Sequence, residues 1–454
     1  MHVTLIKPRL SGNRHEFYIT FLSIEPLSIA TVAGLIPDDI DLSFYDDRFE
    51  DIPFDKPTDL VGITVDAYSA KRAYAISAEY RKRGVSVMLG GFHPTLMPEE
   101  AEEHSDVVVL GEAENIMEEL IDDFRNNRLK KRYQSSKPAC LERINPRREI
   151  FQGKPYLHLH AVEFGRGCKY RCSFCCIHQF YKGAWRCRDI ESFVKEVEGL
   201  HHKIIMFADD NLATGLRKVK QLLRALISLR IKWISQASMD VAKDDELLSL
   251  MRDSGCIGLL IGLESLDDKN LTAMNKNARK GQYAEGIKKI QYYGISINGS
   301  FIWGLDEDTK ESLMEQLDFA IKQRFIFSGF NQLMPYPGTP LYDRLQAEGR
   351  LLYDKWWLDQ EDYFGSPAIR PKNFTPDELA LIRFEARRKF YSIPSIIYRV
   401  LGSRIHLRSL SQIIFYLFNS YRLGRGRYTE EKKALPSQLC SRNISPVEAQ
   451  SSSY

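Results

Sequence analysis

The chain has 454 residues, of which 44% are hydrophobic and 27% charged, a composition typical of a soluble globular protein with two or three domains. Its formal net charge of +3 is too near zero to favour nucleic acid as a partner, and no apolar run reaches the roughly 18–20 residues of a membrane span. Five of the eight cysteines lie from Cys168 to Cys187, which indicates metal binding in a reducing, cytoplasmic compartment rather than a disulfide framework.

Residues 1–130 alternate short apolar runs with amphipathic stretches, a pattern that predicts βαβ units and a parallel sheet. The expected strands are His2–Ile6, Ile40–Tyr45, Leu60–Thr64, Val85–Leu89 and Val107–Leu110, and the clearest helices are Ala70–Arg83 and Ala113–Phe124. In open parallel sheets, ligands bind beyond the carboxyl ends of the strands. Gly90 and Gly91 follow the fourth strand, where they permit a ligand to approach the backbone; a glycine pair there is also consistent with an ordinary tight turn.

Residues 131–155 are rich in Lys, Arg, Ser and Pro, and we expect them to form a linker between domains. The βα alternation resumes over 156–345, where Asp189 is expected to cap the first helix. Six strands are expected in this second unit, at Val162–Phe164, Ile204–Phe207, Ile231–Gln236, Gly258–Gly262, Ser296–Trp303 and Gly329–Met334. Residues 346–435 are expected to form a helical domain closing over it, and the polar tail 436–454 to be disordered.

Three cysteines, Cys168, Cys172 and Cys175, lie within eight residues on the loop after the first strand of the second unit. Thiolates hold iron–sulfur clusters, usually four to a cluster, so three with no obvious fourth leave one iron open to another ligand. The alternative is a zinc site in which His178 supplies the fourth ligand of a Cys3His set. The local spacing alone leaves both interpretations open.

The spacing Cys-x3-Cys-x2-Cys, with the aromatic Phe174 before its last cysteine, resembles the signature of the radical S-adenosylmethionine (SAM) enzyme family. The resemblance implies a partial (βα)6 barrel in which the three cysteines hold a [4Fe–4S] cluster and SAM binds the open iron. One electron, from a donor such as a flavodoxin or ferredoxin, then cleaves SAM to methionine and a 5′-deoxyadenosyl radical. The Pro-Gly-Thr-Pro turn from Pro337 to Pro340 is similar to the end of the final strand in that family.

Residues 1–130 resemble the cobalamin-binding domain that precedes the radical core in one large branch of the family. The matching segments include Gly90–Thr95 and Gly111–Glu114. This resemblance implies a Rossmann-like domain that binds cobalamin at its strand ends, near Gly90 and Gly91. The Asp-x-His-x-x-Gly motif, which supplies a histidine to cobalt in many other cobalamin proteins, is absent. We interpret His93 as a loop histidine with local hydrogen bonds rather than as a cobalt ligand.

The resemblance also assigns strand-end residues of the second unit to SAM. Asp209 or Asp210 stands where the family has the acidic residue that binds the amino group of the cofactor. Glu264 resembles a glutamate near its ribose and carboxylate, Trp303 lies in the segment similar to the one that packs against adenine, and Ser238 ends the third strand. Without the resemblance, Asp-Asp-Asn after a strand is also ordinary turn and capping chemistry.

These features predict a cobalamin-dependent radical SAM enzyme, most simply a methyltransferase acting on an unactivated carbon of a lipid-like or secondary-metabolite substrate. One alternative is radical cyclisation, carbon–carbon bond formation or oxidation of a lipid or tetrapyrrole without methyl transfer. A non-enzymatic alternative is a zinc-stabilised interaction protein. The apolar segment Ser409–Tyr421, within the arginine-rich stretch 409–427, is either a core-facing helix or a peripheral contact with a membrane.

Overall fold

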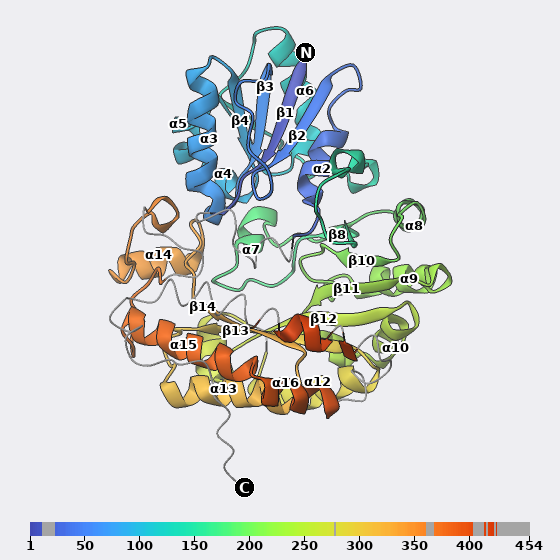
Figure 1. Ribbon diagram of the computed structural model, residues 1–454, viewed down its shortest axis with the longest axis vertical. Coiled ribbons are helices and arrows are strands. Elements are labelled where there is room, and N and C mark those ends of the chain that lie inside the picture. Colours follow the sequence, from blue (N-terminus) through green and yellow to red (C-terminus); the bar gives the residue numbers. More distant parts are fainter. Residues whose placement is uncertain are drawn as a thin grey trace.

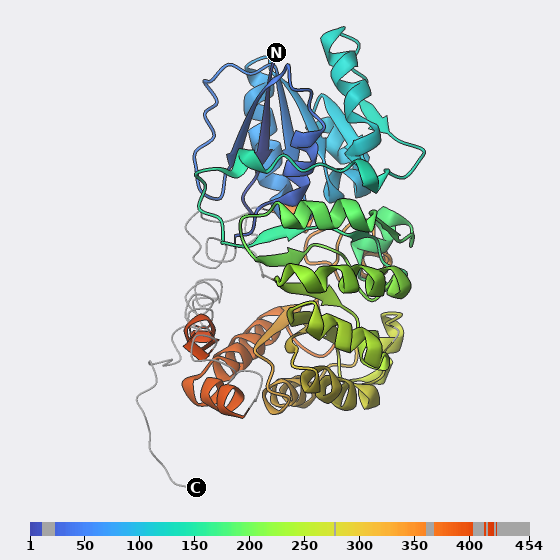
Figure 2. The same cartoon turned by 90° about the vertical axis from the view of Figure 1, so that its right-hand side faces the viewer.

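The computed structural model describes residues 1–10, 23–276, 278–359, 367–402, 413–414, 416–421 and 424. Figure 1 shows two α/β units stacked along the long axis of the molecule, with the N-terminus in the upper unit and the C-terminal helices beside the lower one. The view at right angles shows the same stacking (Figure 2). Within the described residues, no helix is long and apolar enough to cross a membrane.

The first unit is a six-stranded sheet in the order β2-β1-β3-β4-β5-β6, with every neighbouring pair parallel. Its strands are β1 (His2–Lys7), β2 (Asp41–Asp46), β3 (Leu60–Thr64), β4 (Ser86–Gly90), β5 (Val107–Leu110) and β6 (Arg132–Gln134). The helices between them are α2 (Leu27–Gly34), α3 (Ala70–Lys82), α4 (Phe92–Leu96), α5 (Pro98–Glu103) and α6 (Met117–Arg125). Helices cover both faces, so central strands are continuous apolar runs, and the five strands expected from the sequence are confirmed to within one residue.

The prediction of a linker over residues 131–155 is wrong in part, because the first of these residues form a strand of the first unit's sheet. β6 pairs in parallel with β5, and Tyr133 is buried with its hydroxyl donating to Asp123 at 2.9 Å. Further along, Phe151 packs in the core of the first unit, with Tyr156 beside it. The sequence signal was weak because this edge strand has a single apolar residue between polar neighbours, Arg132 and Gln134.

The second unit is an open parallel sheet in the order β14-β13-β12-β11-β10-β7, which curves into a partial barrel. Its strands are β7 (His160–Val162), β10 (Ile204–Phe207), β11 (Lys232–Ala237), β12 (Cys256–Glu264), β13 (Ser296–Trp303) and β14 (Phe327–Gln332). The outer helices are α8 (Ile190–Glu198), α9 (Leu216–Leu226), α10 (Asp245–Asp253), α11 (Asp268–Ala273), α12 (Lys280–Tyr292), α13 (Lys310–Lys322) and α14 (Pro340–Ala347). Asp189 caps α8 as expected, accepting the Ser192 N–H at 2.9 Å.

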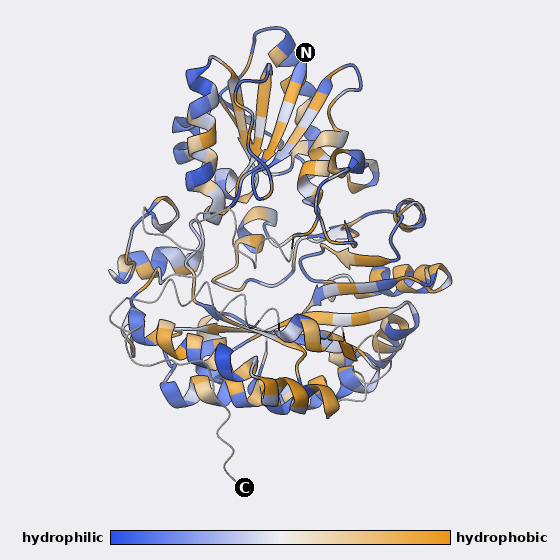
Figure 3. Ribbon diagram, viewed as in Figure 1, coloured by the Kyte–Doolittle hydropathy of each residue, from blue (hydrophilic) through white to orange (hydrophobic). Residues whose placement is uncertain are grey.

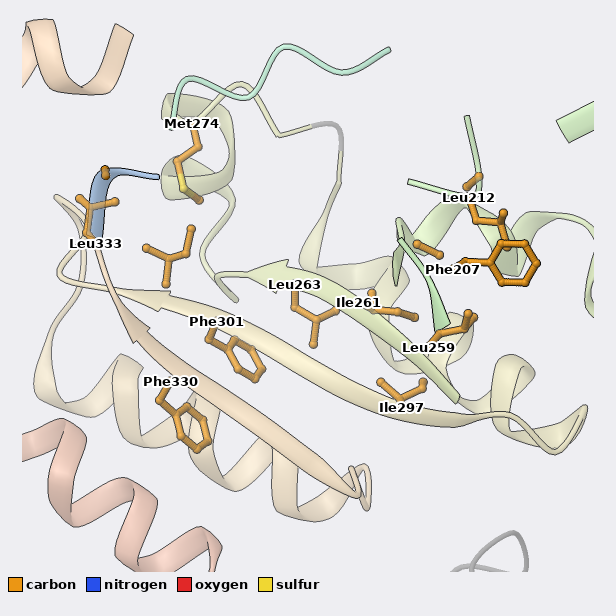
Figure 4. Close-up of a cluster of buried hydrophobic side chains, with 14 of the residues drawn as sticks. Phe207, Leu212, Leu259, Ile261, Leu263, Met274, Ile297, Phe301, Phe330 and Leu333 are labelled. Carbon is orange, nitrogen blue, oxygen red and sulfur yellow. The ribbon is translucent and has the colours of Figure 1, made fainter. Parts of the chain in front are cut away.

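Side chains on one face of the barrel sheet form its core with the outer helices. Figure 4 shows Leu263 of β12, Phe301 of β13 and Phe330 of β14 on the face that these helices cover. Because successive side chains of a strand point to opposite faces, Ser300 and Asn331 face the other side, where they line a cavity. The core is thus formed on the helix-facing side of the sheet, and polar side chains can occupy the inner face.

The chain after the barrel covers the β14 edge and also contacts the first unit. α15 (Pro376–Phe390) lies against β14, and the Arg387 guanidinium donates to the Phe330 carbonyl at 2.8 Å. The buried Trp357 donates its indole N–H to Glu100 of the first unit at 2.9 Å. α16 (Ile393–Leu401) follows α15. The expected 346–435 domain therefore contains helices that close the barrel; most of its residues beyond 402, and the tail 436–454, lie outside the described residues.

Candidate active site

The three cysteines lie on a loop whose two ends are joined by a short antiparallel hairpin, β8 (Gly165–Arg166) with β9 (Arg186–Cys187). Gly167 has a φ of +89°, and a Cβ atom there would collide with the Ala184 carbonyl, so only glycine fits this turn. Within the loop, α7 (Cys176–Tyr181) begins directly after Cys175. The loop therefore leaves the barrel and returns to it at one point, beyond the carboxyl end of β7.

Cys168, Cys172 and Cys175 line one cavity of about 610 Å³ at the carboxyl ends of the barrel strands. Within the described residues, no three His, Cys, Asp or Glu side chains are close enough together to hold a single metal ion. Cysteine thiolates are the usual ligands of iron–sulfur clusters, and three of them on the wall of one cavity are suited to holding such a cluster. His178, the fourth ligand of the zinc alternative, does not line this cavity.

Burial raises the pKa of Cys175 to about 12 and also raises the pKa of Cys172. Both are therefore protonated in the metal-free chain at neutral pH, and metal binding has to displace their protons. The Asn211 side-chain amide donates to Cys168 Sγ at 3.5 Å. Hydrogen bonds to cysteine sulfur are among the contacts by which a protein tunes an iron–sulfur cluster.

The two aspartates that the sequence left as alternatives have different positions. Asp209 is buried, does not line the cavity, and accepts the backbone N–H groups of Phe164 at 3.0 Å and Gly165 at 2.7 Å. Asp210 lines the cavity and accepts the Gly167 N–H at 2.7 Å. Burial raises the pKa of Asp210 to about 6, which leaves it ionised at neutral pH and able to face a cationic ligand. Asp209 is thus placed to hold the loop and Asp210 to meet a ligand.

Glu264 also lines the cavity, at the end of β12, and its φ of +65° is unusual for a residue other than glycine. Its carboxylate accepts Lys276 Nζ at 2.9 Å. Gly262, two residues earlier, has no side chain, and a Cβ atom there would collide with the Glu264 carboxylate. Residues in sparsely populated backbone conformations are common at ligand sites. The missing side chain at Gly262 leaves the space that the Glu264 carboxylate occupies.

Of the other two expected contacts, Ser238 lines the cavity and Trp303 does not. Trp303 is fully buried, and its indole N–H donates to Gln316 of α13 at 3.0 Å. The alternation of side chains along β13 explains the difference, because Trp303 faces the helices while its neighbour Ile302 lines the cavity. The expectation that Trp303 packs against the adenine of SAM therefore does not fit its position.

Several cavity residues were not identified from the sequence, because they come from separate elements with no motif of their own. They are Asn211 after β10, Lys276 after α11, Arg383 and Arg387 of α15, Tyr68 of the first unit and Tyr336 after β14. The two arginines and Tyr68 reach the site only through the packing of α15 and of the first unit on the barrel, whereas Tyr336 belongs to the barrel's own loop after β14. No local spacing in the chain could have indicated that packing.

A second cavity, of about 380 Å³, lies between the two units at the carboxyl ends of the first sheet. Gly90, Gly91 and Gly111 line it, and a Cβ atom on Gly111 would meet nothing within 4 Å. Such glycines leave the backbone open to a large cofactor, as the expectation for Gly90 and Gly91 requires. None of the described residues lining this cavity is a histidine; His93 is buried elsewhere, 3.0 Å from Glu100. Asp210 lines this cavity as well as the first one.

An ion-pair network joins the first unit to the base of the cysteine loop. Arg166 of β8 donates to Glu112 at 2.9 Å and to Glu163 at 2.7 Å, and it lies 2.6 Å from Glu114. Arg186 of β9 donates to the same Glu112 oxygen at 2.8 Å. Burial opposes ionisation of Glu112, but hydrogen bonds, from Arg186 first, outweigh it and hold its pKa below the ordinary value. Both strands of the hairpin are thus fixed to one carboxylate of the first unit.

The chain matches the Radical SAM superfamily over residues 162–320 and the B12 binding domain over residues 22–121. It is 30% identical over 396 residues to the bacteriochlorophyllide d C-12(1)-methyltransferase of Chlorobaculum tepidum, covering 84% of this chain and 86% of that relative. It is 31% identical over 354 residues to the bacteriochlorophyllide d C-8(2)-methyltransferase of the same organism, covering 73% and 78%.

Among solved structures, the fold is similar to that of the cobalamin-dependent S-adenosylmethionine radical enzyme OxsB with aqua-cobalamin and S-adenosylmethionine bound. The TM-score is 0.66 at 16% identity, over 93% of this chain and 71% of that chain. The expected fold class is confirmed: a Rossmann-like N-terminal unit followed by a parallel partial barrel.

The ion-pair network predicts that Glu112→Gln loosens the hairpin. Neutralising Glu112 weakens two charge-assisted hydrogen bonds, each worth about 1.5–3 kcal/mol, so hydrogen exchange at the amides of 165–167 and 186–188 should accelerate roughly tenfold or more. Hydrogen-exchange mass spectrometry measures this directly. Glu119→Gln is the control, because Glu119 pairs with Lys130 on the exposed surface, where ion pairs contribute little. Equal exchange in both variants would show that the network does not hold the loop.

Proposed function

The chain belongs to the radical SAM superfamily, in the branch that also carries a B12 binding domain, and on that premise we propose that it methylates an unactivated carbon of a large, mostly apolar substrate. It is an enzyme whose cofactors are SAM, a [4Fe–4S] cluster and cobalamin. The proposal depends most on one observation: Asp210 lines both the cysteine cavity and the glycine-lined cavity. Two cofactor sites with a common wall can act on one substrate carbon without release of an intermediate.

In this proposal Cys168, Cys172 and Cys175 hold the cluster, and Asp210 accepts hydrogen bonds from the ammonium group of SAM. Glu264 and Ser238 orient the rest of SAM, and the backbone at Gly90 and Gly91 lies against cobalamin. When bound, these cofactors supply hydrogen abstraction and a transferable methyl group. The chain's own residues bind and orient the reactants and exclude water from the site. An external donor such as a flavodoxin or ferredoxin supplies the electron.

We propose a flat, apolar substrate with an acidic group, such as a tetrapyrrole carboxylate. The two relatives are named for bacteriochlorophyllide d. In this chain Tyr68 and Tyr336 line the cysteine cavity and supply aromatic surface for a ring, while Arg383 and Arg387 are suited to a carboxylate. A lipid-like substrate with an acidic head would use the same wall, so the two are compared directly in the assay below.

The first test measures cluster and product together. Anaerobically reconstituted protein should be brown with about four iron per chain. It should form 5′-deoxyadenosine and add one CH2 to a bacteriochlorophyllide or to a lipid acid, as seen by mass spectrometry. Replacing Cys168, Cys172 and Cys175 by Ala should abolish all three signals, whereas Cys140→Ala, at an exposed cysteine outside the loop, should keep them. A product without the added CH2 would point to cyclisation or oxidation instead.

The second test concerns cobalamin. Gly90→Leu should remove cobalamin binding, because Met88 on the same face of β4 lines the second cavity and a new side chain at 90 would occupy the same space. The backbone tolerates the change, since a Cβ atom at Gly90 lies 3.6 Å from Val109 Cβ. At Gly91 a Cβ atom would lie only 2.8 Å from the Val65 carbonyl, so Gly91→Leu would also disturb the fold. The readout is corrinoid absorbance retained after desalting, with Gly281→Leu on α12 as control. Retention by Gly90→Leu would place cobalamin elsewhere.

The third test separates ligand contact from loop support. Asp210→Asn and Glu264→Gln should raise the dissociation constant of SAM roughly tenfold to a hundredfold, the worth of one charge-assisted hydrogen bond, and leave the cluster intact. Asp209→Asn should instead lower iron content, because an amide cannot accept both loop N–H groups. Anaerobic calorimetric titration and iron analysis measure the two effects. Unchanged SAM affinity in Asp210→Asn and Glu264→Gln would contradict the placement of SAM.

A further inference from the structure

The face of α16 that points away from the protein is apolar. Arg399 fixes the orientation of this helix: it is buried, donates to the carbonyls of Phe325 and Ile326 at 2.7 and 2.8 Å, and packs over the Phe390 ring. On the side of α16 opposite Arg399, side chains spaced four residues apart therefore point outward. They are Ile393, Ile397 and Leu401, which are 60%, 44% and 63% exposed.

The described residues between 413 and 421 extend the same surface. Tyr416 packs with Ile326, Ile396 and Val400, which places this segment beside α16. Its outward side chains are Ile414, Leu417, Phe418 and Tyr421, all of them exposed. We call the exposed side chains of α16 and of this segment the C-terminal apolar face.

Exposed large apolar side chains are concentrated on this face. Eight of the twelve in the described part of the chain lie between Ile393 and Tyr421. Figure 3 shows α16 as largely hydrophobic at the lower edge of the molecule, and Figure 2 shows that this edge is distant from the first unit. Scattered exposed apolar residues need no explanation, but a concentration of this kind marks an interaction surface.

The charge of the surrounding sequence indicates the partner. Between Glu385 and Glu430 the chain has nine Arg or Lys residues and no Asp or Glu, although acidic and basic residues are nearly equal in the whole protein. Three of these cations act within the protein, because Arg387 and Arg399 donate to backbone carbonyls and Lys389 pairs with Asp318. An apolar face whose surrounding sequence still has a clear excess of cations over acids is typical of proteins that bind an anionic lipid bilayer. A protein partner with an apolar patch would not by itself require this absence of acidic residues.

We propose that the C-terminal apolar face docks the enzyme on a membrane that contains anionic lipids. The aliphatic side chains of α16 and the aromatic residues Phe418 and Tyr421 enter the interface between head groups and acyl chains, and the excess of cations in the surrounding sequence attracts the anionic surface. The enzyme lies on the bilayer and does not cross it. The proposal is independent of the reaction that the active site performs.

The test is flotation of the full-length protein with vesicles of phosphatidylcholine alone or mixed with phosphatidylglycerol. Wild type should float with the anionic vesicles, much less with the neutral ones, and less at high salt because salt screens the charges. Ile397→Glu with Leu401→Glu should weaken anionic-vesicle binding by about tenfold or more, since two charges replace apolar groups at the interface. Ile227→Glu is the matched control, because Ile227 is 41% exposed and lies after α9, away from this face.

Iron content and thermal melting establish that each variant is folded. Absence of binding to anionic vesicles, or equal binding by the double variant, would overturn the proposal. A dimer in analytical ultracentrifugation that the double variant abolishes, without vesicle binding, would also overturn it and assign the face to self-association. Equal binding to neutral vesicles at all salt concentrations would contradict the role of the cations.

Discussion

The cysteine loop is held in place by carboxylates from two sides, and both cavities border on the segment that this restraint fixes. Asp209 and Asp210, at the end of β10, accept the N–H groups of residues 164, 165 and 167. From the other side, Glu112 of the first unit accepts Arg166 and Arg186. Metal ligands must be fixed within fractions of an ångström, and a long loop has too little packing of its own to achieve this. Charge-assisted hydrogen bonds at its base supply the rigidity that the loop lacks.

The same bonds determine how the two cavities lie relative to one another. The hairpin at the base of the cysteine loop is also a polar contact between the barrel and the first unit, so it helps to fix how the two cavities lie relative to one another. Asp210 forms part of both walls. A network of buried charges is costly to separate, so it would hold the residues that line the two cavities in a constant relative position.

The sequence predicted most of the fold, because apolar runs and amphipathic stretches of regular length depend on local pattern alone. The cysteines, which the sequence predicts as cluster ligands, and Ser238 and Glu264, predicted as contacts of SAM, line one cavity. The sequence did not separate Asp209 from Asp210, since adjacent residues share every local signal and differ only in which side of the strand end they occupy. It placed Trp303 wrongly because the face of a strand depends on register against its neighbours. Arg383, Arg387 and Tyr68 of the cavity wall come from remote elements, and only the packed structure brings them to the site.

The segment after the barrel, which contains α15 and α16, has more than one structural role. α15 covers the β14 edge, which would otherwise expose unpaired backbone groups, and Arg387 satisfies one of them at the Phe330 carbonyl. On the same helix, Arg383 and Arg387 reach the cavity. α16 then packs outside it through the buried Arg399, which leaves an apolar stripe outward. If that stripe rests on a bilayer, the membrane-facing helix packs directly against α15, whose arginines line the cavity, so one short segment connects the two surfaces.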